Sequence, residues 1–245
     1  MHSVRTALIP RFIVFAALLF GVANLTQAQI SEQPAVNVEQ AIAQWNASNK
    51  TCRINVTPAL TAVAACEQRD TFSKLLVEMK HCYGPTDKAG SAIWSPCDAA
   101  KAAQDSAWAR TTVQFHRMGG VFRLPATING RTNVYFIVDS GAATVQIPAE
   151  VAEEMKRNGT LADADFLGQR RFLLADGSGL QQRVFRLRTL QIGGKSMENV
   201  LAAVGAQRSR ALLGQSFLRR LNGWKIDNVK NAIELEFTAP VNFGR

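Results

Sequence analysis

The second half of the chain consists of short apolar runs separated by turns. After Arg110, eight segments rich in Val, Ile, Leu and Phe alternate with Gly- or Asn-containing stretches, two of which hold the hairpin dipeptides Asn129-Gly130 and Asp176-Gly177. Regularly spaced short strands predict a small closed or sandwich-like β domain. The predicted strands cover residues 111–117, 120–128, 134–140, 170–176, 183–192, 199–205, 222–227 and 232–237.

Two stretches of this β domain instead predict short helices. The first begins at Pro148, which suits a first helical turn, and stops at Gly159. The second covers residues 214–223. We therefore expect a mainly β domain with two short helices over residues 110–245.

Residues 1–28 have the layout of a secretory signal peptide. Basic residues precede an apolar run from about Phe12 to Leu25, and Thr26 and Ala28 form a small-residue cleavage site. The run is shorter than the roughly 20 residues that cross a bilayer, although an uncleaved N-terminal anchor remains an alternative. We expect an exported protein, periplasmic or secreted, with no stable membrane span after signal cleavage.

Residues 30–108 predict a small helical region. Between Val38 and Trp108, apolar residues recur three and four apart, and alanine-rich stretches contain few β-branched residues. Gly84-Pro85 and Gly90 interrupt this pattern. A region of this size buries little apolar surface on its own, so covalent cross-links would contribute much of its stability.

All four cysteines of the chain, Cys52, Cys66, Cys82 and Cys97, lie in this helical region. They are too widely spaced for C-x-x-C metal or redox motifs, and an exported chain meets an oxidising compartment. We expect two disulfides and no metal. Of the three pairings, we favour Cys66 with Cys82 and Cys52 with Cys97, because this nested arrangement joins two antiparallel helices at two levels.

The apolar run of the third predicted strand stops at a carboxylate, Asp139, which is followed by Ser140, Gly141 and Ala142. Burying an ionised carboxylate without a partner is costly, so such an aspartate pairs with a cation, accepts hydrogen bonds in a turn or shares a proton with a second carboxylate. Aspartates that cap turns are common where strands end. The Asp-Ser-Gly triplet alone does not distinguish these cases.

The order of elements around Asp139 resembles that of the retropepsin-like aspartic proteases, most closely the single-domain bacterial members that follow an export signal. The chain has, in order, a hairpin, a strand ending in Asp-Ser-Gly-Ala, a helix, an Asp-Gly hairpin and a Leu-Leu-Gly element before the second helix. The resemblance covers about residues 113–237. It does not include the cysteine-bearing region.

The resemblance implies a role for each motif residue. Asp139 would be the catalytic carboxylate, the Ser140 hydroxyl would brace the active-site loop, Gly141 would permit its tight turn and Ala142 would leave space beside the catalytic pair. Ser140 replaces the Thr of many family members, which keeps a hydroxyl and loses a methyl group. The flap over bound peptide would contain Ala175, Asp176, Gly177, Ser178 and Gly179. The residues behind the loop would be Leu212, Leu213 and Gly214.

Aspartic proteolysis needs two carboxylates that share one proton, one to activate water and one to protonate the scissile carbonyl oxygen. The chain contains one suitable motif, because Asp227 lacks a following Ser/Thr-Gly and Asp176 lies in a predicted turn. We therefore expect an aspartic endopeptidase that is a homodimer, with one Asp139 from each subunit. Its partners would be peptide or protein substrates, and it would need no cofactor.

Other function classes fit the sequence less well. The alternative is a non-catalytic peptide-binding or assembly module on the same fold, since a fold does not guarantee turnover. A serine hydrolase is not supported, because the chain has three histidines and no G-x-S-x-G motif. The net charge of +9 is scattered without an aromatic platform or helix-turn-helix pattern, so no nucleic-acid partner is expected.

Overall fold

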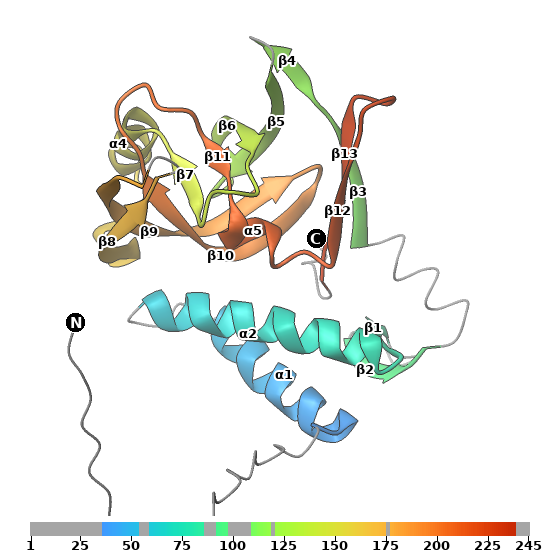
Figure 1. Ribbon diagram of the computed structural model, residues 1–245. Helices are drawn as coiled ribbons and strands as arrows, with labels where there is room; N and C mark the ends of the chain where they lie inside the picture. Colours follow the sequence, from blue (N-terminus) through green and yellow to red (C-terminus); the bar gives the residue numbers. More distant parts are fainter. Residues whose placement is uncertain are drawn as a thin grey trace, which may run out of the picture. The chain divides into compact units, whose positions relative to one another are not determined.

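The computed structural model describes residues 36–53, 59–85, 92–97, 109–118, 121–174 and 177–238 (Figure 1). The predicted signal peptide, the alanine-rich stretch after Cys97, and the flap residues Ala175 and Asp176 lie outside these ranges. Among the described residues, no helix is long and apolar enough to cross a membrane.

The first helix of the cysteine-bearing region, α1 (Val38–Arg53), begins at a reciprocal cap. The Asn37 side chain accepts a hydrogen bond from the Gln40 amide at 2.9 Å, and the Gln40 side chain accepts one from the Asn37 amide at 3.1 Å. Helix α2 (Ala59–Glu78) packs against α1. Trp45 of α1 is almost fully buried, and its indole N–H donates to Ser73 of α2 at 2.8 Å.

A hairpin follows α2 where the sequence predicted helical structure, so this part of the prediction is wrong. Strands β1 (His81–Pro85) and β2 (Ala92–Pro96) pair antiparallel. Lys80 has a φ of 59°, a left-handed conformation that ends the preceding helix. Tyr83 and Trp94 then meet Trp45 with ring centroids 4.9 to 5.6 Å apart, which gives the hairpin an aromatic core with α1.

The two disulfides join Cys52 to Cys66 and Cys82 to Cys97, which corrects the nested pairing that we favoured. The reason is the hairpin. Cys82 lies on β1 and Cys97 directly follows β2, so strand pairing brings these two together. Helix packing places Cys52, at the end of α1, beside Cys66 on α2. No described cysteine is free.

Replacing Cys52 and Cys66 together by serine is expected to lower the free energy of unfolding by about 2–5 kcal/mol, because the small α1–α2 unit then loses its cross-link. Urea denaturation monitored by circular dichroism measures the change. The wild-type protein treated with reductant provides a control that breaks both bridges. Four free thiols in protein isolated from its native compartment would contradict the assignment.

The rest of the described chain is a closed β domain with two short helices, as predicted (Figure 1). Eight strands form one sheet in the order β4-β5-β6-β11-β7-β10-β9-β8, and a further pairing of β5 with β9 closes the sheet on itself. A second sheet has the order β12-β13-β3. The elements are β3 (Arg110–Gln114), β4 (His116–Met118), β5 (Val121–Ile128), β6 (Thr132–Val138), β7 (Val145–Ile147), α4 (Ala149–Arg157), η1 (Asp163–Asp165), β8 (Phe166–Leu173), β9 (Gly179–Ile192), β10 (Lys195–Val204), β11 (Leu212–Leu213), α5 (Gln215–Leu218), β12 (Gly223–Asp227) and β13 (Ala232–Glu236).

The structure of this domain contains the turns that the sequence predicted. Asn129 and Gly130 have φ values of 49° and 71°, and this turn joins β5 to β6. Helix α4 follows Pro148 and stops before Gly159, whose φ is 73°. The second predicted helix is shorter than expected, because α5 ends at Leu218 and Gly223 already belongs to β12.

Helix α2 also packs on the β domain. Val63 of α2 joins a buried cluster with Val184 of β9 and Leu201 of β10, and Leu167 and Phe172 of β8 pack against this cluster. The cysteine-bearing region therefore shares a hydrophobic contact with the strands of the β8–β9 hairpin.

Candidate active site

Asp139 directly follows β6 and begins a tight turn. Its Oδ1 accepts hydrogen bonds from the backbone N–H groups of Gly141 at 2.9 Å and Ala142 at 3.2 Å. The carboxylate is partly exposed, while Ser140 and Gly141 are exposed. A Cβ added at Gly141 would lie 3.3 Å from Asp139 Oδ1, which is a tight contact. The turn therefore orients the carboxylate and leaves it accessible.

A second aspartate of the chain makes the same local turn. Asp227 is the last residue of β12, and its Oδ1 accepts hydrogen bonds from the amides of Val229 at 3.0 Å and Lys230 at 2.9 Å. The hydrogen bond from the Lys230 amide lowers the pKa of Asp227 below its ordinary value. The turn alone thus does not mark Asp139 as special. What differs is the structure that surrounds each turn.

The Asp139 turn is held from behind by β11. This strand lies between β6 and β7, parallel to the first and antiparallel to the second, with Leu212 opposite Ile137 and Leu213 opposite Val138. The Asp139 amide donates to the Leu213 carbonyl at 3.1 Å. The backbone of Asp139 is therefore anchored to a segment more than 70 residues later in the chain.

Gly214 allows the closest approach in this arrangement. A Cβ at this position would lie 2.2 Å from the Thr144 carbonyl oxygen and 2.7 Å from the Ala142 carbonyl oxygen. Both contacts are to backbone, so no side-chain rotation can relieve them. Only glycine fits here without moving the loop.

Two residues that the sequence analysis missed complete the support. Gln215 donates from its backbone N–H to the Ala142 carbonyl at 2.8 Å and from its side-chain amide to the Ser140 carbonyl at 2.7 Å. The buried Ser216 hydroxyl accepts from the Val145 amide at 2.8 Å and donates to the Leu201 carbonyl at 2.6 Å. Their position directly after Leu-Leu-Gly, as polar residues within an apolar stretch, is the one signal that could have identified them.

The Ser140 hydroxyl, expected to brace the loop, makes no hydrogen bond to any residue in the described part of the chain. The brace at this position is the main-chain carbonyl of Ser140, which accepts a hydrogen bond from the Gln215 side chain. The hydroxyl itself lies on an exposed residue.

The hairpin that the sequence predicted as a flap joins β8 to β9, with Leu173 opposite Gly179. At its tip the Gly177 amide donates to the Leu174 carbonyl at 2.9 Å, and Gly177 has a φ of 82°. Leu173 is 76% exposed and Leu174 47%, so the described part of the tip presents apolar side chains to solvent. An exposed apolar hairpin tip is suited to contact a peptide.

Among the residues that the structure describes, no three His, Cys, Asp or Glu side chains come together in a way that could hold a metal ion.

A closed β domain whose strand-end aspartate is backed by an apolar-apolar-Gly segment resembles the layout described above for the retropepsin-like aspartic proteases. Residues 124–220 match the family described as gag-polyprotein putative aspartyl protease, a span that contains Asp139, the β8–β9 hairpin and Gly214. This match confirms the resemblance seen in the sequence. Among solved structures, a retropepsin-like aspartic protease from Rickettsia conorii is 22% identical, with a TM-score of 0.37, over 52% of this chain and 90% of that chain. No curated protein matches the sequence.

Proposed function

We propose that this protein is an aspartic endopeptidase whose active site forms at the two-fold axis of a homodimer, with one Asp139 from each subunit. The observation that carries the proposal is the fixed loop. Asp139 is held by its own turn and by the Leu213 carbonyl, Gly214 packs against the backbone of Ala142 and Thr144, and Asp139 is nevertheless partly exposed. The surface hairpin at Asp227 has the turn without this support.

The chemistry requires two carboxylates that carry one proton between them. The ionised carboxylate takes a proton from water as the water oxygen attacks the peptide carbonyl carbon, and the protonated carboxyl gives its proton to the carbonyl oxygen. Collapse of the resulting tetrahedral diol breaks the C–N bond: the carboxyl that took its proton from water gives it to the leaving nitrogen, and the other carboxylate takes a proton from a diol hydroxyl as the new carbonyl forms. Because the sequence has one Asp-Ser/Thr-Gly triplet, the second carboxylate comes from a second copy.

Further roles follow from this assignment. Gly141 and Ala142 hold the carboxylate through their amides, while Leu212, Leu213 and Gly214 hold the loop. The β8–β9 hairpin, whose described tip includes Gly177, Ser178 and Gly179, would close over a peptide or protein substrate as the flap. The two disulfides fit an oxidising compartment, which supports an exported protein that is periplasmic or secreted.

Specific activity is expected to fall when the protein is diluted through its dimer dissociation range, because each subunit supplies half of the catalytic pair.

A plot of the cleavage rate against pH should also be bell-shaped, since only the singly protonated pair contains both a base and an acid. Peptide-library cleavage followed by mass spectrometry measures the rate, and sedimentation measures the dimer fraction.

Two outcomes of this experiment would contradict the proposal. Constant activity per chain at concentrations where sedimentation finds only monomer would place a second catalytic carboxylate within the same chain. A verified dimer that binds peptides and releases no cleavage product at any pH would instead indicate the non-catalytic peptide-binding module.

A further inference from the structure

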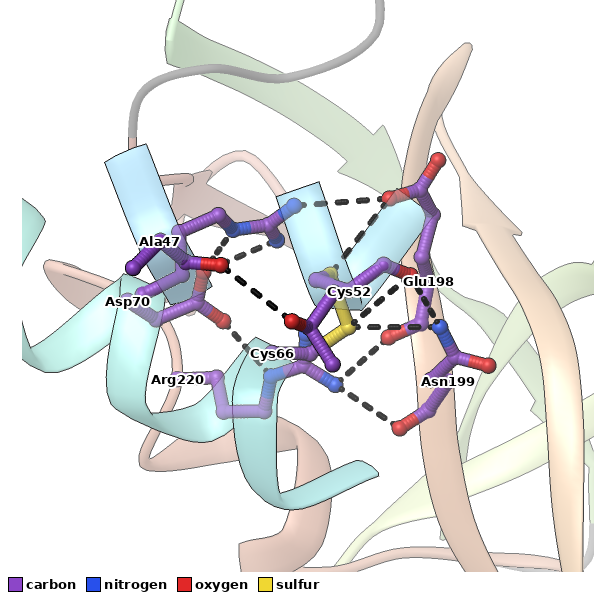
Figure 2. Close-up of a disulfide and its surroundings, with 9 residues drawn as sticks. Ala47, Cys52, Cys66, Asp70, Glu198, Asn199 and Arg220 are labelled. Atoms are coloured by element: carbon purple, nitrogen blue, oxygen red, sulfur yellow. Dashed lines mark hydrogen bonds and ion pairs between the residues drawn. A yellow bond between two sulfur atoms is a disulfide. The ribbon is translucent and has the colours of Figure 1, made fainter. Parts of the chain in front are cut away.

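A buried ionic cluster joins helix α2 to the β domain (Figure 2). We call it the docking cluster, and its members are Arg69, Asp70, Glu198, Asn199 and Arg220. The shortest of its contacts runs from Arg220 Nε to Asp70 Oδ2 at 2.6 Å, and both side chains are at most 3% exposed. Arg69 binds the other carboxylate oxygen of Asp70 at 2.9 Å and reaches Glu198 at 3.4 Å. The docking cluster is therefore a buried contact between α2 and the β domain, and we call this contact the joint.

Arg220 connects three segments of the chain. While its Nε binds Asp70 of α2, its Nη1 donates to the main-chain carbonyls of Glu198 at 2.8 Å and Asn199 at 3.2 Å, both in β10. Figure 2 shows the guanidinium between Asp70 and Asn199. The fork geometry of arginine is suited to this double role, because separate N–H groups point at separate acceptors. Arg220 thereby fixes the turn after α5 against both α2 and β10.

Asn199 supplies a second, independent contact at the same joint. Its φ is 50° although it lies within β10, a conformation that is uncommon for residues other than glycine. Its side-chain amide donates to the Cys52 carbonyl at 2.8 Å and to Cys66 Sγ at 3.3 Å. The strand is thus distorted where it meets the Cys52–Cys66 disulfide. Backbone strain of this kind persists when surrounding contacts hold it.

The joint lies one short helix away from the candidate active site. Helix α5 begins at Gln215, which binds the carbonyls of Ser140 and Ala142, and the chain reaches Arg220 two residues after α5 ends. Lys74 of α2 adds a contact to this turn, since its Nζ donates to the Arg219 carbonyl at 2.6 Å. One end of α5 therefore holds the Asp139 loop and the other end is held by α2.

A buried ion pair is a poor way to gain stability, because desolvating both charges offsets most of their attraction. An apolar pair of the same volume would often stabilise the fold equally well. An ion pair with several directed hydrogen bonds does, however, define one geometry. The Asp70–Arg220 pair is therefore better explained by the position it imposes than by the stability it adds.

We propose that Asp70 and Arg220 are positioning residues for the active-site loop: together they fix α5, and α5 fixes the segment from Ser140 to Ala142. This inference rests on the proposed proteolytic function for its effect on rate, but its structural part does not. The cysteine-bearing region is then a permanent part of the working enzyme, because it supplies Asp70.

The test compares Asp70→Asn with the matched control Arg219→Gln in the full mature chain. The control breaks a neighbouring contact between the same turn and the same helix, since Arg219 binds Glu67 at 2.6 Å, but with an arginine that is 57% exposed. Asp70→Asn is expected to lower kcat by about 10-fold or more with KM changed by less than about 2-fold, because misplaced catalytic groups cost rate more than binding. Arg219→Gln should stay within about 2-fold of wild type in both.

Two further variants separate positioning from folding. Rates are measured under conditions in which circular dichroism shows that each variant is folded. Arg220→Lys keeps the positive charge but loses the planar fork of N–H groups. Its kcat should lie between the kcat of wild type and that of Asp70→Asn. The double variant of Asp70→Asn with Gln215→Ala should lose much less kcat than the product of the two single losses, because both act through α5. Multiplicative losses, or an equal loss in Arg219→Gln, would overturn the proposal.

A readout that needs no substrate distinguishes this inference from the proposed function. Hydrogen exchange of the Gly141 and Ala142 amides, which donate to Asp139, should accelerate in Asp70→Asn and remain at the wild-type rate in Arg219→Gln. If this happens while no protein, wild type included, cleaves any peptide, positioning stands and proteolysis fails. If peptides are cleaved but exchange is unchanged in folded Asp70→Asn, proteolysis stands and positioning fails.

Discussion

Asp139→Asn is expected to abolish peptide cleavage and to leave the fold intact. The asparagine keeps the shape of the side chain, and its carbonyl oxygen can still accept the hydrogen bonds from Gly141 and Ala142. It can neither take a proton from water nor share one with a second carboxylate, so both halves of the catalytic step are lost. Cleavage of a peptide library from acid to neutral pH, followed by mass spectrometry, measures the loss.

Asp227→Asn is the matched control for this substitution. Asp227 makes the same pair of turn hydrogen bonds at the end of a strand, in a hairpin that carries none of the β11 support. Its variant should cleave peptides at the wild-type rate. Substantial cleavage by a sequence-verified Asp139→Asn protein would refute the assignment of the catalytic carboxylate.

Mixing the two kinds of chain extends the same prediction to the dimer. An excess of Asp139→Asn chains added to wild type should suppress its activity, because mixed dimers would have one functional carboxylate. Asp227→Asn chains added in the same excess should not suppress it. Suppression by neither chain would argue against a site shared between subunits.

The β domain could be predicted because its signals are local. Apolar runs of five or more residues and dipeptides such as Asn129-Gly130 report strand and turn without knowledge of the partners. Strands β7 and β11, with three and two residues, carry too few residues for any periodicity. Their strand character comes from the neighbours that they pair with, and in the sequence it was the resemblance that drew attention to Leu212 and Leu213.

The cysteine-bearing region was harder to predict for a physical reason. Apolar spacing identified α1 and α2, but the residues from His81 to Pro96 form a hairpin whose stability depends on packing against Trp45 and on a turn at Lys80. Missing that hairpin led directly to the wrong disulfide pairing. The pair of Asp70 with Arg220 spans 150 residues, and no local pattern marks either one.

At the candidate active-site loop, the sequence indicated Asp139 as the candidate catalytic residue and Gly214 behind it, but not the contacts between them. Gln215 and Ser216 act through hydrogen bonds to residues 71 to 75 positions earlier and to Leu201, so their roles exist only in the folded chain. Fixing a reactive group with several weak, distant contacts is how a fold holds catalytic geometry.

Gly214→Ala is expected to remove peptide cleavage while costing the fold a few kcal/mol, of the order that overpacking produces. The backbone of Gly214, with φ −97° and ψ −169°, is open to alanine, so the entire effect is steric. The added methyl carbon would lie 2.2 Å from the Thr144 carbonyl oxygen and 2.6 Å from its carbon, and two backbone segments would have to separate. Since Gln215 binds the Ala142 carbonyl next to this contact, the separation would displace the Asp139 loop.

Gly223→Ala is the control for Gly214→Ala, because a Cβ at Gly223 would meet nothing within 4 Å. It should change the free energy of unfolding by no more than about 0.5 kcal/mol and leave cleavage unaffected. Urea denaturation gives the stability of both variants, and cleavage is compared at a temperature where both are folded. If folded Gly214→Ala cleaves peptides as fast as Gly223→Ala, the loop does not depend on the close packing of β11, and the role proposed for Leu212 to Gly214 is wrong.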